Sequence, residues 1–109
     1  MCIRDRYNLK LLTCPKLIMA KSKIMIDNSK VRVTEWVFNP GDETGQHIHE
    51  YDYVVVPMKD GILKIVNEDS SITFSELKKG ISYFREKGVN HNVINANKFQ
   101  YSFIEIEIK

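Results

Sequence analysis

The sequence has very few cysteines, and their position limits what the protein can be. It contains two, Cys2 and Cys14, both within the first eighteen residues. Residues 19–109 contain none, so no disulfide framework supports that part of the chain, and we expect a cytoplasmic protein. No apolar run approaches the roughly 18–20 residues that a membrane-spanning helix requires. The sequence therefore argues against a membrane protein.

An excess of charge of one sign is also missing from most of the chain. The whole sequence has 16 basic and 14 acidic residues, a net charge of +2. The first eighteen residues hold four of the basic and one of the acidic residues, which leaves 12 basic against 13 acidic, or −1, in residues 19–109. A basic surface for nucleic acid or membranes is therefore not expected.

The first eighteen residues differ from the rest, because they show no strand-like alternation. The apolar stretch LLTCPKLI is interrupted by Pro15 and Lys16, which does not fit the apolar centre of a signal peptide. The opening MCIRDR resembles translated sequencing-adapter sequence. We predict that residues 1–18 are a non-native or disordered extension, that Met19 is the native start, and that residues 19–109 form one domain.

From Val31 onward, the sequence alternates between short strand-like segments and turn signals. The segment VRVTEWVF alternates and is rich in β-branched and aromatic residues, and Asp60–Gly61 is a hairpin signal. No apolar stripe of helical period is present. We predict seven strands in an all-β, antiparallel sandwich or barrel, at residues 31–38, 46–58, 62–66, 71–77, 81–84, 91–95 and 99–109.

The three histidines are the main candidates for chemistry. Side chains along a strand repeat their direction every second residue, so His47 and His49 should face the same side. Tyr51 and Tyr53 continue that face if the strand stays regular. Two imidazoles that point one way form half of a metal site, and His91 on another strand could complete it. Neutral imidazole suits zinc, copper, iron and nickel.

The spacing around these histidines resembles the two motifs of the cupin superfamily. In the first motif, Gly41 is followed by five residues and then by H-x-H at positions 47–49. In the second, Gly80 precedes Gly88, His91 and Asn95 at the cupin spacing, although Glu86 stands where proline is usual. The resemblance covers about residues 31–109. The segments at residues 31–57, 88–96 and 103–109 also resemble a narrower group of short, stand-alone cupins. Some members of that group are linked by name to β-alanine breakdown.

The resemblance implies a small antiparallel jelly-roll barrel with a divalent metal ion near one mouth. His47, His49 and His91 would be the ligands, and Asn95 would stabilise a turn. Gly41 and Gly80 would permit tight turns, and Gly88 would let the loop fold back before His91.

The chain departs from the cupin pattern at one important position. The glutamate expected four residues after the second histidine is replaced by Tyr53. Three neutral imidazoles leave a divalent ion its full charge, which acidifies bound water and attracts anions. Some cupin thiol dioxygenases also bind iron through three histidines. Tyr53 could therefore ligate the ion, donate a hydrogen bond or simply pack.

The function that the resemblance implies is a metal-binding cupin that acts on or binds a small, anionic metabolite. Iron is the first choice of metal, with zinc, nickel or manganese as alternatives, and an Fe(II) dioxygenase is the first reaction class. A non-catalytic binding or sensing protein and a metal-dependent isomerase or lyase remain as alternatives. We also predict a homodimer that pairs through strands 31–38 and 99–109 as exposed edges.

Several other residues have a structural and a functional interpretation. Arg85 precedes the second motif and could hold a substrate carboxylate in a bidentate contact. Tyr51 shares the two interpretations of Tyr53, namely a role in the site and packing. Trp36 and Phe38 are expected in the core. Glu105 and Glu107 share one face of the last strand and are expected to lie on a solvated edge.

Overall fold

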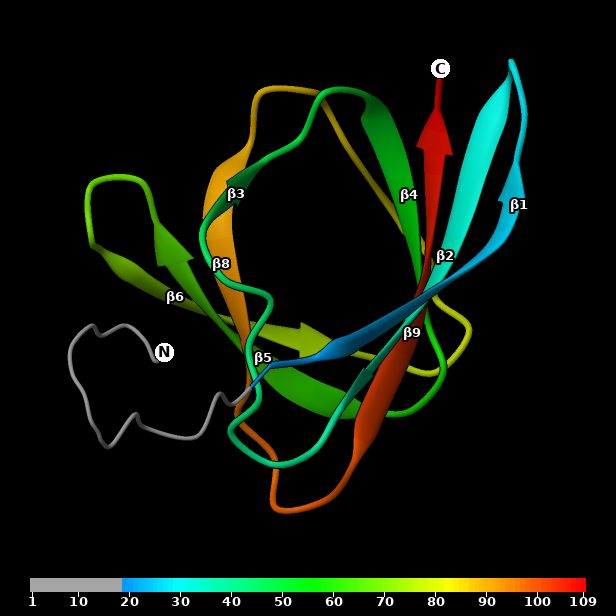
Figure 1. Cartoon of the computed structure of the whole chain (residues 1–109). Helices are drawn as coiled ribbons and strands as arrows, with labels where there is room; N and C mark the ends of the chain where they lie inside the picture. Colours follow the sequence, from blue (N-terminus) through cyan, green and yellow to red (C-terminus); the bar gives the residue numbers. More distant parts are fainter. Residues whose placement is uncertain (1–18) are drawn as a thin grey trace, which may run out of the picture.

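A computed structural model describes residues 19–109 as a barrel of nine antiparallel strands in two sheets (Figure 1). The first sheet has the order β1-β2-β9-β4-β7 and the second has the order β3-β8-β5-β6. The strands are β1 (Lys21–Asp27), β2 (Val31–Phe38), β3 (His47–Ile48), β4 (Asp52–Pro57), β5 (Gly61–Asn67), β6 (Ile72–Leu77), β7 (Tyr83–Arg85), β8 (Asn90–Asn95) and β9 (Tyr101–Ile108). The predicted all-β jelly-roll class is confirmed. The expectations for residues 1–18, including both cysteines, lie outside the described residues.

Most of the predicted strands are present, but the structure differs from the prediction at residues 46–58 and at β1. The segment 46–58 was predicted as one strand and forms two, β3 and β4. The chain leaves the second sheet after Ile48 and enters the first at Asp52. Between them, the His49 backbone bonds to the loop before β8, with the N–H donating to Val89 O at 2.9 Å and the carbonyl accepting from Gly88 N at 2.8 Å. The alternation of side chains is interrupted here.

The other difference is β1, which the sequence did not predict. All seven of its residues are exposed, so no buried face imposes the alternation by which a strand is recognised. The strand pairs with β2 along one side, with a register shift between Ile24 and Ile26. Its other side is an edge of the sheet. A backbone ladder rather than apolar burial defines this strand.

The two terminal strands expected at the edges are in fact internal. β2 lies between β1 and β9, and β9 lies between β2 and β4. The interior face of β9 consists of Tyr101, Phe103, Glu105 and Glu107, all buried. The prediction of a solvated edge for Glu105 and Glu107 is therefore wrong. Alternation put them on one face, but the sequence could not tell which face.

The core lies between the sheets and adjoins the histidines, because several of its residues also line the cavity that holds them. It contains Phe38, Tyr53, Val55, Leu63, Leu77, Val93, Tyr101 and Phe103. The rings of Phe38 and Phe103 lie 5.5 Å apart. Phe38 is fully buried, so its expected place in the core is confirmed. Trp36 is only partly buried; it packs against the core cluster and also lines the cavity. No helix in residues 19–109 is long and apolar enough to span a membrane.

Turns with unusual backbone angles bring the two motif segments together. Gly41 and Gly88 have φ angles of 82° and 96°, a region that side chains disfavour. Gly88 donates to His49 O, which positions the second motif against the first. Gly80 also has a positive φ of 76°. These angles fit the turn roles predicted for the motif glycines.

Asn95 connects three segments through its buried side chain. Its Nδ2 donates to Phe38 O at 3.2 Å and to Phe99 O at 2.9 Å. Its Oδ1 accepts from the backbone N–H and the side-chain amide of Asn97, both at 2.8 Å. Every polar atom of the side chain is thus used by protein. The predicted role in stabilising a turn fits these contacts.

This network yields a stability prediction for Asn95→Asp. The substitution removes both donors and places an anion against two carbonyl oxygens, so we expect a loss of about 2–4 kcal/mol in the free energy of unfolding. Asn90→Asp is the matched control, because Asn90 accepts through Oδ1 from Gln46 Nε2 and an aspartate retains that acceptor. The control should stay within about 0.5 kcal/mol of wild type in urea unfolding. Equal losses in both variants would contradict the role of Asn95.

Candidate metal centre

A cavity of about 370 Å³ lies between the sheets and contains all three histidines. Its walls come from both sheets. The second sheet contributes His47 and His91, and the first sheet contributes Tyr53, Arg85 and Glu105. The cavity is therefore the place where the two halves of the barrel present their polar side chains to one another.

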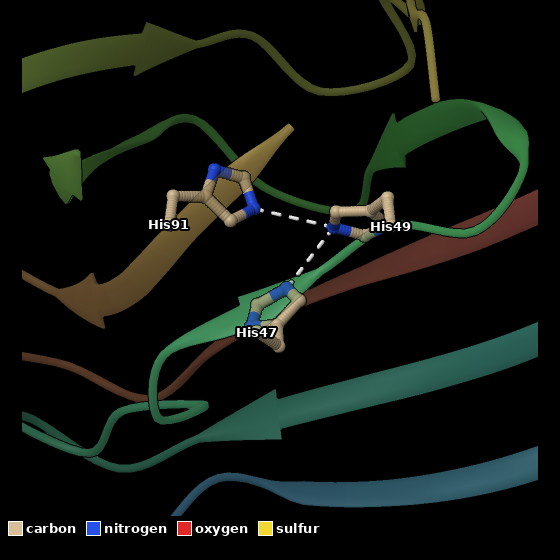
Figure 2. Close-up of side chains that lie close together, drawn as sticks. All are labelled: His47, His49 and His91. Atoms are coloured by element: carbon tan, nitrogen blue, oxygen red, sulfur yellow. Dashed lines mark hydrogen bonds between the residues drawn. The ribbon is translucent and has the colours of Figure 1, made fainter. Parts of the chain in front are cut away.

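The strand register brings the histidines together. His47 and His91 are direct partners across β3 and β8. His49 follows β3 and is only 7% exposed, whereas Ile48 between the two histidines is 64% exposed and points away. Figure 2 shows the three rings turned toward a common point. Nε2 of His49 lies 3.0 Å from Nε2 of His47 and 3.2 Å from Nε2 of His91.

A hydrogen bond to the backbone fixes which nitrogen of His47 faces the others. Its Nδ1 lies 2.8 Å from the carbonyl oxygen of Gly45. A carbonyl oxygen can only accept, so Nδ1 must carry the proton, and neutral His47 presents a bare Nε2. Such a bond to a carbonyl is the usual partner of a metal-binding histidine. His47 is thus held in the tautomer that a ligand needs.

Burial keeps the other two imidazoles neutral. Desolvation, with help from His47, lowers the pKa of His49 to about 4. Desolvation is also the main cause that lowers the pKa of His91 to about 3, followed by the effects of His47, His49 and Arg85. Both rings are therefore uncharged near neutral pH. A metal ion would not have to displace a proton from an imidazolium.

The three nitrogens fit a divalent transition metal. With metal–nitrogen bonds of about 2.1 Å, two nitrogens 3.0–3.2 Å apart subtend roughly 90–100° at the ion. This is the angle between neighbouring ligands of an octahedron. The ligand atoms of the third pair, His47 and His91, lie within 4.8 Å of each other, and three protein ligands would leave further positions for water or substrate. The donor set is three neutral imidazoles, which suits iron, zinc or nickel better than calcium or magnesium.

A second group of possible ligands lies on the other side of His49. Nδ1 of His49 is 3.9 Å from Glu105 Oε2, and Glu107 completes this group. However, Glu107 is held in a two-point contact by Arg32, with Nε at 2.6 Å and Nη2 at 3.1 Å. A metal in this group would have to break that ion pair. The histidine group is therefore the better candidate.

Glu105 is the functional candidate that sequence reasoning missed. It is 8% exposed, lines the cavity and accepts a long hydrogen bond from Trp36 Nε1 at 3.4 Å. Burial, together with the charge of Glu107, raises the pKa of Glu105 to about 7. A Glu-x-Glu pair in a strand shows that both side chains share one face, but not whether that face is buried or exposed. Only the order of strands in the sheet shows that this face of β9 is buried.

Tyr53 packs flat against His49. The two ring centroids are 3.9 Å apart and the rings are inclined by 15°. Burial is the main cause that raises the pKa of Tyr53 well above its ordinary value, so the phenol stays protonated. Its hydroxyl makes no hydrogen bond to residues 19–109. Of the three roles left open by the sequence, packing has direct support, and the ring that Tyr53 packs on is that of His49.

Arg85 and Tyr51 are placed differently. Arg85 lines the cavity, at the position of β7 that pairs with Tyr53 of β4. Tyr51 is not among the cavity residues, and its ring instead lies 5.9 Å from the guanidinium carbon of Arg32. The expectation that Tyr51 continues the face of the histidines is wrong, because the strand breaks at residues 49–51.

Comparisons with known proteins agree with this geometry. No family model matches the chain. A curated protein from Pseudomonas aeruginosa, named "Beta-alanine degradation protein BauB", is 49% identical over 86 residues, which cover 79% of this chain and 90% of that protein. A cupin domain of known structure from Bordetella pertussis is 48% identical, covers 87% of this chain and 98% of its own, and has a TM-score of 0.82. The chain belongs to the cupin superfamily.

More distant cupins share the fold alone. An RmlC-like cupin from Methanocaldococcus jannaschii, described as a double-stranded β-helix, is 16% identical. It covers 97% of this chain and 91% of its own, with a TM-score of 0.69. The resemblance seen in the two motifs is thus confirmed for the cupin fold as a whole.

The stack on His49 predicts different effects for two substitutions of Tyr53. Tyr53→Phe removes only the hydroxyl, which has no partner among the described residues, so stability should change by less than about 1 kcal/mol. Tyr53→Ala removes a buried ring from the core and should cost about 3–5 kcal/mol. Urea unfolding of the three proteins measures both effects. A large loss for Tyr53→Phe would show that the hydroxyl has a structural partner.

Proposed function

We propose that this cupin holds one divalent metal ion through His47, His49 and His91 and uses it to bind or transform a small anionic metabolite. The observation that supports this most directly is that Nε2 of His49 lies 3.0 Å from Nε2 of His47 and 3.2 Å from Nε2 of His91, with the ligand atoms of all three rings within 4.8 Å of one another. Neutral His49 and His91 and the tautomer of His47 add to it. Iron(II) is the first candidate for the ion, and it would supply redox capacity for chemistry with dioxygen.

The surroundings of the histidines favour an anionic ligand. All three ligands are neutral, and Tyr53 stands where many cupins have a glutamate, so no ligand carboxylate offsets the charge of the ion. The guanidinium of Arg85 lies at the same cavity and offers five N–H donors in a fork that matches a carboxylate. Arg85 would orient the anion, and the apolar walls would exclude water around it.

The relative named for β-alanine degradation narrows the class of metabolite. At 49% identity over most of both chains, it supports a role with short carboxylates or amino acids. The name states no reaction. We therefore extend to this chain only the chemical class of ligand. The reaction class is to be decided by identifying the bound metal.

Metal content tests this proposal. The full chain, purified anaerobically without a polyhistidine tag, should carry about one transition metal ion per chain by elemental mass spectrometry. His49→Ala should weaken binding by more than the roughly 10–100-fold that loss of a ligand's hydrogen-bond partner costs, while the barrel still folds. Asn90→Asp, next to His91 on β8, is the matched control and should retain the metal.

The identity of the metal decides between the reaction classes. Iron would favour oxygen chemistry, which an oxygen electrode can follow with candidate thiols and small acids. Zinc, nickel or manganese would favour an isomerase or lyase. A wild-type protein that binds no metal after reconstitution would contradict the proposed metal site and favour a binding protein without catalysis.

We also propose a homodimer, with its interface moved from the two internal strands to β1. Within residues 19–109, one side of this strand has no pairing strand, and it exposes Ile24, Met25 and Ile26 at 58%, 55% and 49%. An apolar, unpaired edge favours pairing with another strand. A second copy of the chain offers the same edge, which is what a two-fold contact requires.

Light scattering at micromolar concentration should give the mass of a dimer. Ile24→Lys places a charge on the β1 edge and should shift the protein toward the monomer. Ile72→Lys is the matched control, because Ile72 lies on β6, at the edge of the other sheet, with a similar exposure of 53%. A monomeric wild type, or equal shifts in both variants, would contradict this interface.

A further inference from the structure

Two ionisable side chains of opposite sign border the cavity and have no partner of opposite charge among the described residues. One is buried Glu105, and the other is Arg85, an exposed residue whose guanidinium carbon lies 5.2 Å from the centre of the Tyr83 ring. Arg85 and Glu105 both line it. The described ion pairs include neither an acid within 4 Å of Arg85 nor a lysine or arginine within 4 Å of Glu105. Arg32, the cation on the neighbouring strand, is taken by Glu107. The two charges thus face the same space without neutralising one another.

Glu105 has unused capacity to accept hydrogen bonds. A carboxylate offers about four acceptor positions, and Glu105 receives one long bond from Trp36 at 3.4 Å. The distance of 3.9 Å to His49 Nδ1 is too long for a hydrogen bond. A carboxylate that is 8% exposed and has so few partners is costly to bury. A donor or a cation in the cavity would offset that cost.

The strand register gives the separation between the two charges. On the inner face, Arg85 pairs with Tyr53 of β4, and Glu105 pairs with Val55 of the same strand. The two residues therefore lie on β7 and β9, with β4 between them, and are offset by two residues along the strand direction. Standard strand spacing puts their Cα atoms about 12 Å apart, and both side chains reach inward. A molecule a few carbons long would fill the space that remains between the charged groups.

We propose that the cavity binds a small zwitterion, an ω-amino acid or similar aminoalkyl carboxylate, with its carboxylate on Arg85 and its ammonium group on Glu105. This rests on the proposed function for the anionic end and adds a cation subsite at the other end. A cation subsite would offset the cost of burying a carboxylate in a wall whose other lining residues, apart from Arg85, are apolar or uncharged polar side chains. A ligand with only a carboxylate would leave buried Glu105 without a cationic partner.

Calorimetric titration of the metal-loaded full chain tests the two subsites. The probes are ω-amino acids from glycine to 5-aminovalerate, each compared with the carboxylate of the same length that lacks the amine. At the best length, the amino acid should bind at least tenfold more tightly than its carboxylate. Glu105→Gln should bring the two affinities within about twofold of each other. Arg85→Gln should weaken both ligands.

Glu107→Gln is the matched control. Glu107 lies on the same face of β9, two residues away, but is paired with Arg32 and does not line the cavity. This variant should keep the preference for the amine. Metal content and melting temperature are measured for every variant, so that a loss of preference in Glu105→Gln is read only in a folded, metal-loaded protein.

Three results would overturn the zwitterion subsites. The first is equal affinity of amino acids and carboxylates for the wild type, which would leave an anion-binding metal cupin and so spare the proposed function. The second is an unchanged preference in Glu105→Gln. The third is the absence of binding by all probes to metal-loaded protein. Failure of the wild type to bind metal would instead count against the proposed function.

Discussion

The site depends on one constraint, the pairing of His47 with His91 across β3 and β8. This register, with the turn that returns His49 toward the same point, places Nε2 of His49 3.0 Å from Nε2 of His47 and 3.2 Å from Nε2 of His91. Burial denies the rings the water that would stabilise their charged forms, so His49 and His91 stay neutral. Lone pairs held this close favour a cation between them. The candidate metal site is therefore a consequence of strand register and desolvation acting together.

The charges around the histidines follow from one departure from the cupin motif. Tyr53 occupies the sequence position of the missing glutamate and covers the face of His49. The carboxylate nearest to the site is Glu105, on the opposite side of that ring and too far for a direct bond. An ion held by the three histidines would keep its full charge toward the cavity. The recognition of an incoming molecule would then fall to the ion, Arg85 and Glu105.

The sequence predicted the parts of this structure that depend on local spacing. The jelly-roll class, strand 31–38 and the three histidines follow from alternation and from two motifs. The break at residues 49–51 was not predicted, because it arises from backbone bonds between His49 and the loop at Val89 and Gly88. That break sends Tyr51 out of the cavity. The buried place of Glu105 and the exposed strand β1 depend on the order of strands in the sheet, which spacing along the chain does not contain.

The most direct test of the central claim is X-ray diffraction from metal-loaded crystals, with data collected at the absorption edge of the bound metal. The anomalous signal should lie between the Nε2 atoms of His47, His49 and His91, at about 2.1 Å from each. A signal beside Nδ1 of His49, in contact with Glu105 and Glu107, would contradict it. So would fully loaded crystals with no ordered metal in the cavity.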